Sequence, residues 1–216
     1  MKHATAVLVL ALCFSLSAVA QSDNAVPDLH SHEGTISSGI YTNDFFEFSV
    51  EIPTGWKVVD NARYEALYNK SREKAAKNPD LAKLGQGTEI NAPLLVMAET
   101  KLWTDGKNHR MVRILSTELR AQPGTPSAEE FLNFVADANR KFGLSENYVG
   151  KPESFSLGGR TAWKAYFNQQ GSTRVWHSLN VAIVAKNHIL QFILTSPDED
   201  GLRSLETLLR TVRFRN

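Results

Sequence analysis

The fold class is decided by two stretches near the C-terminus: residues 154–167, SFSLGGRTAWKAYF, and residues 175–195, VWHSLNVAIVAKNHILQFILT. Both are rich in aromatic and β-branched residues. Each contains a turn dipeptide, Gly158-Gly159 in the first and Lys186-Asn187 in the second. Connections of two residues join antiparallel neighbours. We therefore expect an antiparallel meander with strands at 154–157, 160–167, 175–185 and 189–195.

Two amphipathic helices flank this meander in the sequence. Before it, apolar residues recur at helical spacing from Phe131 to Phe142, and Ser127 and Glu130 have the spacing of a capping box. After it, a helix that begins at residues 197–200 has an apolar stripe made of Leu202, Leu205, Leu208 and Leu209. Because both helices must bury these residues against a sheet, we expect an α+β sandwich with a mostly antiparallel sheet.

The N-terminal half of the domain predicts more strands around one helical segment. Residues 45–52 alternate in a strand-like way at positions 46, 48, 50 and 52, and Pro53-Thr54-Gly55 closes the run. Residues 61–84 are rich in helix-forming residues but have a thin apolar face, which predicts a mobile segment. Whether residues 61–87 form a lid is not decided by the sequence. The other predicted strands are 56–59, 94–103 and 111–119, and a short strand or docking tail is expected at 211–214.

The first twenty residues have the three parts of a secretory signal peptide. Lys2 and His3 form a short basic region, residues 6–16 form an apolar run, and residues 17–20, SAVA, supply an A-x-A cleavage site before Gln21. The apolar run is shorter than the roughly 20 residues that span a bilayer. We therefore expect an exported protein, periplasmic or extracellular, that loses residues 1–20.

Removal of the signal peptide changes what chemistry the chain can perform. Twenty residues removed from 216 leave 196, and the lost segment contains Cys13, the single cysteine. A disulfide framework, a thiol nucleophile and a cysteine-ligated metal are thereby excluded. Loss of Lys2 turns 24 basic and 23 acidic side chains into 23 of each, so nothing favours nucleic acid as a partner. We expect a polar linker at 21–38, one globular domain at 39–216, and no membrane span after cleavage.

At this point the chain resembles a known family. Residues 41–48, YTNDFFEF, followed by Ile52-Pro53-Thr54-Gly55-Trp56, are similar to the opening of PsbP/Mog-like domains. The C-terminal part is also similar: Gly158-Gly159-Arg160 before an aromatic strand, then residues 196–199, SPDE, a helix, and residues 211–214, TVRF. The resemblance covers residues 40–215 and implies an α/β/α sandwich around an antiparallel sheet.

The resemblance also implies a class of function. Members of this family serve as non-catalytic accessory or binding proteins, among them a photosystem subunit and a regulator of a nuclear GTPase. A secretory signal peptide is incompatible with the nuclear role. Fold does not transfer function within such a set, so the partner is left open. The chain is most similar to exported bacterial members of unassigned role.

One histidine cluster has metal-ligand character. His30 and His32, with Asp28 and Glu33 beside them, lie at i and i+2, a spacing at which an extended chain projects both rings to one side. A stable site needs a third and a fourth ligand in fixed geometry. Because the cluster falls in the predicted linker, we expect a solvated segment and no cofactor, with weak metal binding through His30 and His32 as the alternative.

Three further histidines are the candidates for acid–base chemistry. His109, His177 and His188 lie on or beside predicted strands, and none has a carboxylate partner at an informative spacing. The motif G-x-S-x-G is absent. An exported hydrolase-like enzyme with a histidine–carboxylate pair is therefore the alternative function, and it requires two of these rings to converge with an acid in a pocket.

Large aromatic residues are the candidate binding residues. Trp56 belongs to the P-x-G-W corner and is expected in the core, where large aromatics usually lie. If exposed, the others would anchor a protein partner or a small hydrophobic ligand. This set consists of Trp103, Trp163, Trp176, Tyr64 and Tyr68.

The sequence thus predicts an exported, non-catalytic binding or accessory protein. Its partner is an unknown protein or a small hydrophobic ligand. Its working surface is expected at a sheet edge, or at a groove bordered by residues 61–87 and the polar loop 104–108.

Overall fold

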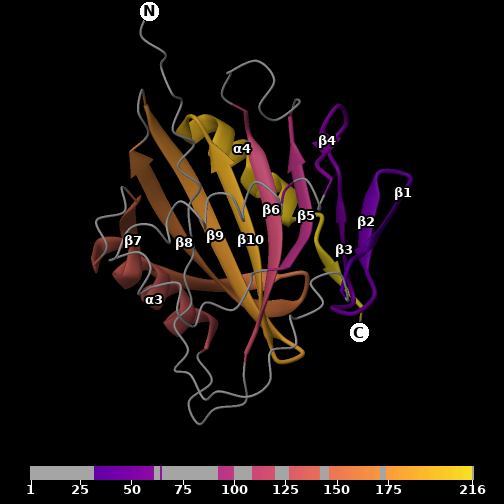
Figure 1. Cartoon of the computed structure of the whole chain (residues 1–216), viewed down its shortest axis with the longest axis horizontal. Coiled ribbons are helices and arrows are strands. Elements are labelled where there is room, and N and C mark those ends of the chain that lie inside the picture. The colour runs from indigo at the N-terminus through magenta and orange to yellow at the C-terminus, as the bar shows by residue number, and fades with distance from the viewer. Residues whose placement is uncertain are drawn as a thin grey trace, which may run out of the picture.

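The computed structural model describes residues 32–60, 64, 92–99, 109–119, 127–141, 146–170 and 174–215. Two sheets and two helices make up these residues, and Figure 1 looks onto the larger sheet. The described strands pair antiparallel throughout.

The larger sheet has seven strands in the order β4-β5-β6-β10-β9-β8-β7. Its C-terminal four strands form the predicted meander, because β7, β8, β9 and β10 are consecutive in both sequence and space. The antiparallel β6 pairs with the free side of β10, so β6 and β10 lie in the middle of the sheet. The bounds are β4 (Lys57–Val58), β5 (Ala92–Ala98), β6 (Met111–Glu118), β7 (Glu146–Leu157), β8 (Arg160–Gln170), β9 (Val175–Ala185) and β10 (His188–Ser196).

The smaller sheet has four strands and lies beside the larger one (Figure 1). Its order is β1-β2-β3-β11, so the last strand of the chain pairs with β3 near the N-terminus. Ser38 and Gly39 join β1 to β2 with φ values of 50° and 76°, as a type I′ hairpin turn requires. The bounds are β1 (Thr35–Ser37), β2 (Ile40–Asn43), β3 (Phe48–Glu51) and β11 (Arg213–Phe214).

Two expectations for the N-terminal region are corrected by this sheet. Strand β1 lies inside residues 21–38, for which the sequence predicted only a linker; its exposed side chains give no apolar signal. The run at 45–52 is not one strand, because residues 44–47 form a turn and β3 begins at Phe48. Phe46 and Phe48 are nevertheless both buried, as the alternation predicted.

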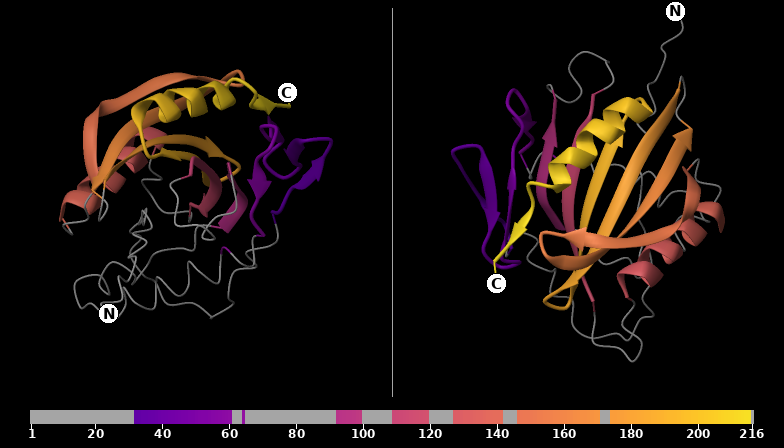
Figure 2. Two further views of the ribbon diagram at one scale, coloured as in Figure 1. Left: turned by 90° about the horizontal axis from the view of Figure 1, so that it is seen from above. Right: turned by 180° about the vertical axis from the view of Figure 1, so that it is seen from behind.

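The two helices cover opposite faces of the larger sheet (Figure 2). Helix α4 (Glu199–Leu209) packs in a core with Leu179, Val181, Leu190 and Phe192, whereas helix α3 (Ala128–Lys141) packs in a separate core with Ala182, Ile189 and Ile193. Successive residues of β9 and β10 alternate between these cores, which is the two-residue period of a strand. The predicted α/β/α sandwich is confirmed.

Side-chain caps hold both helices at their first turns, and the one at α3 is the predicted capping box. Ser127 and Glu130 form the reciprocal capping box, with the Ser127 amide donating to Glu130 Oε2 at 2.7 Å and the Glu130 amide to Ser127 Oγ at 3.2 Å. These hydrogen bonds lower the pKa of Glu130. At α4, Asp198 Oδ1 accepts from the Gly201 amide at 2.6 Å.

Strand β7 is longer than the sequence indicated. It begins at Glu146 instead of Ser154, and its register with β8 shifts between Val149 and Glu153. Residues 146–153 were not predicted as part of the strand because glycine and proline, here Gly150 and Pro152, usually interrupt strands. At the outer strand of a sheet, however, a proline and a bulge are tolerated, since the missing amide is not needed there.

We predict that the α4 side of the larger sheet dominates stability. Phe192 is buried in β10 and its ring lies edge-on to Phe48 at 5.7 Å, so Phe192→Ala should lower the free energy of unfolding by about 3–5 kcal/mol. Val184 on neighbouring β9 is 45% exposed, so Val184→Ala should change the free energy of unfolding by less than about 1 kcal/mol. Urea unfolding measures both, and equal losses would contradict this packing.

Candidate functional site

Four aromatic rings from three distant segments meet at one end of the molecule. His32 precedes β1, Phe45 and Phe46 lie in the β2–β3 turn, and His188 begins β10. The ring of His32 stacks on Phe45 with centroids 3.7 Å apart, and it lies edge-on to His188 at 5.5 Å. Phe46 lies edge-on to His188 at 5.3 Å. We call His32, Phe45, Phe46 and His188 the aromatic corner.

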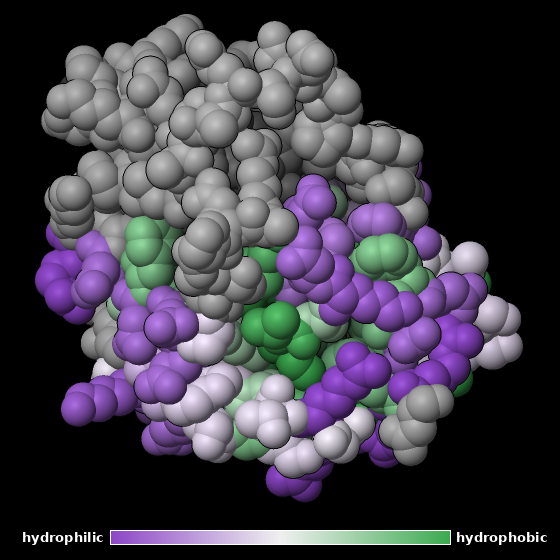
Figure 3. Space-filling view, turned by 90° about the horizontal axis from the view of Figure 1, so that it is seen from below, coloured by the Kyte–Doolittle hydropathy of each residue, from purple (hydrophilic) through white to green (hydrophobic). Residues whose placement is uncertain are grey.

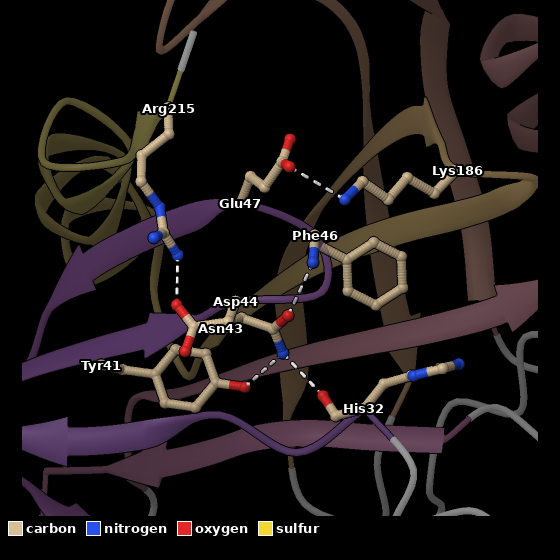
Figure 4. Close-up of polar contacts among 8 residues, drawn as sticks. All are labelled: His32, Tyr41, Asn43, Asp44, Phe46, Glu47, Lys186 and Arg215. Carbon is tan, nitrogen blue, oxygen red and sulfur yellow. Dashed lines mark hydrogen bonds and ion pairs between the residues drawn. The ribbon is translucent and has the colours of Figure 1, made fainter.

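The side chain of Asn43 fixes this corner (Figure 4). Its Nδ2 donates to the carbonyl of His32 at 2.7 Å and to the hydroxyl of Tyr41 at 3.0 Å, while its Oδ1 accepts from the amide of Phe46 at 2.8 Å. Asn43 is fully buried at the end of β2. One amide group therefore joins the segment before β1 to the β2–β3 turn.

Charged side chains surround the aromatic corner. Glu47 lies in the β2–β3 turn at a φ of 58° and pairs with Lys186 at 3.0 Å and with Arg160 at 4.0 Å. Arg215 pairs with Asp44 of the same turn (Figure 4). Arg213 lies on β11, two residues before Arg215, and its side chain is exposed. We call Arg160, Lys186, Arg213 and Arg215 the basic rim.

The space-filling view of this end is consistent with a surface of mixed character. Figure 3 looks at the molecule from below the view of Figure 1, and hydrophilic residues surround smaller apolar areas there. Arg160 lies over the ring of Phe214 at 4.5 Å, and Lys186 lies 5.5 Å from the ring of Phe45. Two of the four cations of the basic rim, Arg160 and Lys186, are thus held near aromatic faces, an arrangement that orients them.

The pKa values at this end follow from these contacts. The hydrogen bond and charge of Lys186, followed by the charges of Arg160 and Arg215, lower the pKa of Glu47, which therefore stays ionised at neutral pH. Burial raises the pKa of Tyr41 to about 12, although the hydrogen bond from Asn43 opposes the shift. Its phenol stays protonated at neutral pH, which suits a structural hydrogen bond and not acid–base work.

One two-contact ion pair away from this end has a structural role. Arg110 makes two contacts with Glu99, of 3.1 Å and 2.5 Å, and donates to Ser204 of α4 at 3.1 Å. The hydrogen bond from Arg110 lowers the pKa of Glu99, against a smaller effect of burial. Arg110 thus connects the start of β6 to α4. The Arg110–Glu99 pair therefore has a structural role, not a catalytic one.

The described aromatic candidates lie on the α3 side of the larger sheet or in the interior. Trp163 is half-buried against the core that contains α3, and Trp176 is half-buried on β9 opposite Gln169. Tyr64 is buried, so it is not an exposed anchor. Trp103 and Tyr68 lie outside the described residues, as do His30 and residues 65–91 and 100–108.

The histidines proposed for acid–base chemistry do not gather around one point. His188 and His177 lie at opposite ends of β10, since His177 is opposite Ser196 and His188 begins the strand. The ring of His188 is packed in the aromatic corner, and its Nδ1 lies 2.7 Å from the carbonyl oxygen of Lys186. His109 lies just before β6 and at the end of the sheet away from His188.

The histidine thought to lie in a solvated linker is instead part of the fold. His32 is half-buried in the aromatic corner, and its neighbour there is His188, which no sequence spacing connects to it. Within the described ranges, no group of three histidine, cysteine or acidic side chains is placed to hold a metal ion. The sequence marked Asn43 only as a turn residue, and its three hydrogen bonds had no signal in the sequence.

We predict that Asn43 controls the docking of the segment before β1. Asn43→Ala leaves a buried amide, carbonyl and hydroxyl without their partner and should lower the free energy of unfolding by about 1–3 kcal/mol. Asn133→Ala, at an exposed position of α3, should be neutral or slightly stabilising because alanine favours helix. Urea unfolding compares the two, and a neutral Asn43→Ala would show that the network is dispensable.

Comparison with known proteins gives a likeness of fold. No family model matches the sequence, and no curated protein does. Among solved structures, cyanobacterial PsbP (CyanoP) from Synechocystis sp. PCC 6803 matches at 13% identity with a TM-score of 0.50, over 82% of this chain and 91% of that one. LpqN, involved in cell envelope biogenesis of Mycobacterium tuberculosis, matches at 11% identity over 78% and 83%, with a TM-score of 0.48.

A third match is the Saccharomyces cerevisiae Ran-binding protein Mog1p, at 9% identity over 85% of this chain and 96% of that one, with a TM-score of 0.44. Identities this low leave activity and partner undetermined, since one fold supports many functions. The likeness to cyanobacterial PsbP confirms the PsbP/Mog-like α+β fold that the sequence predicts.

Proposed function

We propose that this chain is an exported, non-catalytic accessory protein whose basic rim binds an acidic segment of a protein partner. The observation that carries the proposal is that three cations, Arg160, Lys186 and Arg215, converge on the carboxylates of one turn, with the exposed Arg213 two residues from Arg215. They come from β8, the β9–β10 turn and the C-terminal strand, and the carboxylates in contact with them are Asp44 and Glu47.

The rim is suited to a charged partner because its cations are held in place and remain accessible. The side chains of Arg160, Lys186 and Arg215 are 35%, 40% and 58% exposed although each is in an ion pair. Glu47 and Asp44 orient the cations without neutralising all of them. An acidic segment would meet oriented donors, and arginine in particular pairs with carboxylates through two parallel hydrogen bonds.

A protein segment fits this surface better than a polyanion. The whole chain has 24 basic and 23 acidic side chains, so the rim is a local feature of a nearly neutral molecule. Nucleic-acid binding needs many phosphate contacts and an extended basic surface. A small patch with aromatic rings beneath its cations resembles the anchor of a protein interface.

The described titratable groups favour binding over catalysis. Three groups with shifted pKa values, Glu130, Glu99 and Tyr41, serve a helix cap, an ion pair between layers and a buried hydrogen bond. Such structural networks shift pKa values without any catalytic role. In the described part of the chain, no helix is long and apolar enough to cross a bilayer. Export is proposed from the pattern of residues 1–20.

We predict that charge reversal of the rim weakens binding to an acidic probe. The double variant Arg213→Glu/Arg215→Glu should bind a fluorescent peptide of alternating glutamate and glycine at least about tenfold more weakly, a loss of about 1.4 kcal/mol. Fluorescence anisotropy measures the affinity, which should also fall with added salt because the contacts are exposed.

The matched control makes the same change of net charge elsewhere. Arg140→Glu/Arg203→Glu alters two exposed arginines on α3 and α4 and should leave the peptide affinity unchanged. Envelope proteins captured by the native protein and by the control, but not by the rim variant, would identify the natural partner. Equal affinity for both double variants would refute the rim as the binding surface.

We predict that export follows from the first twenty residues. Expressed in a Gram-negative bacterium, the full-length chain should be recovered from the periplasm with Gln21 as its first residue, as intact mass would show. Leu10→Arg interrupts the apolar run and should retain the chain in the cytoplasm, whereas Asn24→Arg beyond the cleavage site should not. Recovery of the native chain uncleaved in the cytoplasm would end the proposal of export.

A further inference from the structure

The two faces of the central strands differ in chemistry although both are buried. On the α4 side, the core positions of β6, β9 and β10 are apolar, such as Ile114, Val181 and Phe192, and the buried serines on that face, Ser116 and Ser196, are small. On the α3 side, each of these strands places one large polar residue among apolar residues and small hydroxyl residues. These residues are Arg113, Asn180 and Gln191, which are 3%, 1% and 1% exposed.

Strand register brings the three polar residues together. Ile193 of β10 is opposite both Arg113 of β6 and Asn180 of β9, so these two residues flank it. Neighbouring strands are about 4.8 Å apart, which places Arg113 and Asn180 about 10 Å from each other. Gln191 is two residues along β10 from Ile193, a diagonal position about 7–8 Å from each of them. The three side chains thus lie around Ile193 on one face of the sheet.

Gln191 is the informative member of this group. Its Nε2 and its Oε1 are both buried and have no hydrogen-bond partner within the described part of the chain. The Oγ1 of Thr195, on the same face of β10, is buried and likewise lacks a partner there. Arg113 and Asn180 engage in contacts of their own. A buried amide with neither bond made costs about 1–3 kcal/mol, so its retention in the middle of the sheet needs a reason.

We infer that the α3-side face of β6, β9 and β10 is a binding site for a small ligand with an amide group on an apolar body. Gln191 offers a free donor beside a free acceptor, and an amide is the group that presents the complementary acceptor and donor together. A carboxylate would satisfy only the donor. This site is independent of the basic rim.

Apolar residues on the same face surround Gln191 and would contact the body of the ligand. Leu115 and Ala182 are opposite it on β6 and β9, and Ile189 and Ile193 lie before and after it on β10. Trp163 of β8 is opposite Ala182 and is half-buried against this core. An apolar wall with a few convergent polar groups is the usual composition of a small-molecule site. In this proposal Trp163, which the sequence singled out as a candidate binding residue, would contact the ligand.

The test is a titration of the purified, 15N-labelled protein with hexanamide and, separately, with hexanoate. Hexanamide should shift the side-chain amide signals of Gln191 in a saturable way. Hexanoate, which has the same chain but cannot donate a hydrogen bond when ionised, should bind at least about tenfold more weakly.

Two variants separate ligand binding from stability. Gln191→Leu should lose hexanamide binding while its melting temperature stays equal or rises, because an apolar side chain replaces the unsatisfied amide. Gln170→Leu, at the exposed end of β8, should bind hexanamide as the native protein does. The native titration is decisive even if a variant folds poorly.

Three results would each overturn the inference. In the first, hexanamide leaves the Gln191 signals unchanged up to its solubility limit, or a high-resolution structure shows only ordered waters on Gln191 that the probe does not displace. In the second, hexanoate binds as tightly as hexanamide. In the third, Gln191→Leu retains the native affinity.

Discussion

The burial of both faces of β6, β9 and β10 is the constraint on which the rest of the structure depends. A strand covered on one side only could leave its alternate residues in water, but these strands are buried between two layers. Each therefore needs one cover for its even positions and another for its odd positions, and α4 and α3 supply them. One of these helices precedes the strands β7 to β10 in the chain and the other follows them.

The same constraint explains how far the sequence could be interpreted. The meander and both helices were predictable because the spacing of apolar residues is a local property of the sequence. Examples are the apolar run HILQFILT of β10 and the leucines of α4. The smaller sheet was predictable only in part: the expected strands at 45–52 and 211–214 contain β3 and β11, whereas β1 is a short exposed strand in the predicted linker. Strand β11 pairs with a segment that is distant in sequence, and a local sequence pattern does not indicate which distant segment a strand pairs with.

The candidate site was predictable only in parts. Trp163 was singled out for its residue type, and the structure places it on the α3-side face that contains Gln191. Gln191 was not singled out, although a lone amide within an apolar strand is visible in the sequence. The convergence of His32 with His188 could not be found, since the contact depends on three hydrogen bonds of Asn43, and a single sequence does not reveal such a network.

The pairing of β11 with β3 has a consequence for when the protein can fold. Strand β3 obtains its second neighbour from residues 213–214, so the smaller sheet stays incomplete until residues far away in the sequence have reached it. Contacts between segments so distant in sequence form slowly, because the loop that they close is long. The smaller sheet is therefore expected to close late in folding, after the hairpins of the larger sheet, whose strands are neighbours in sequence.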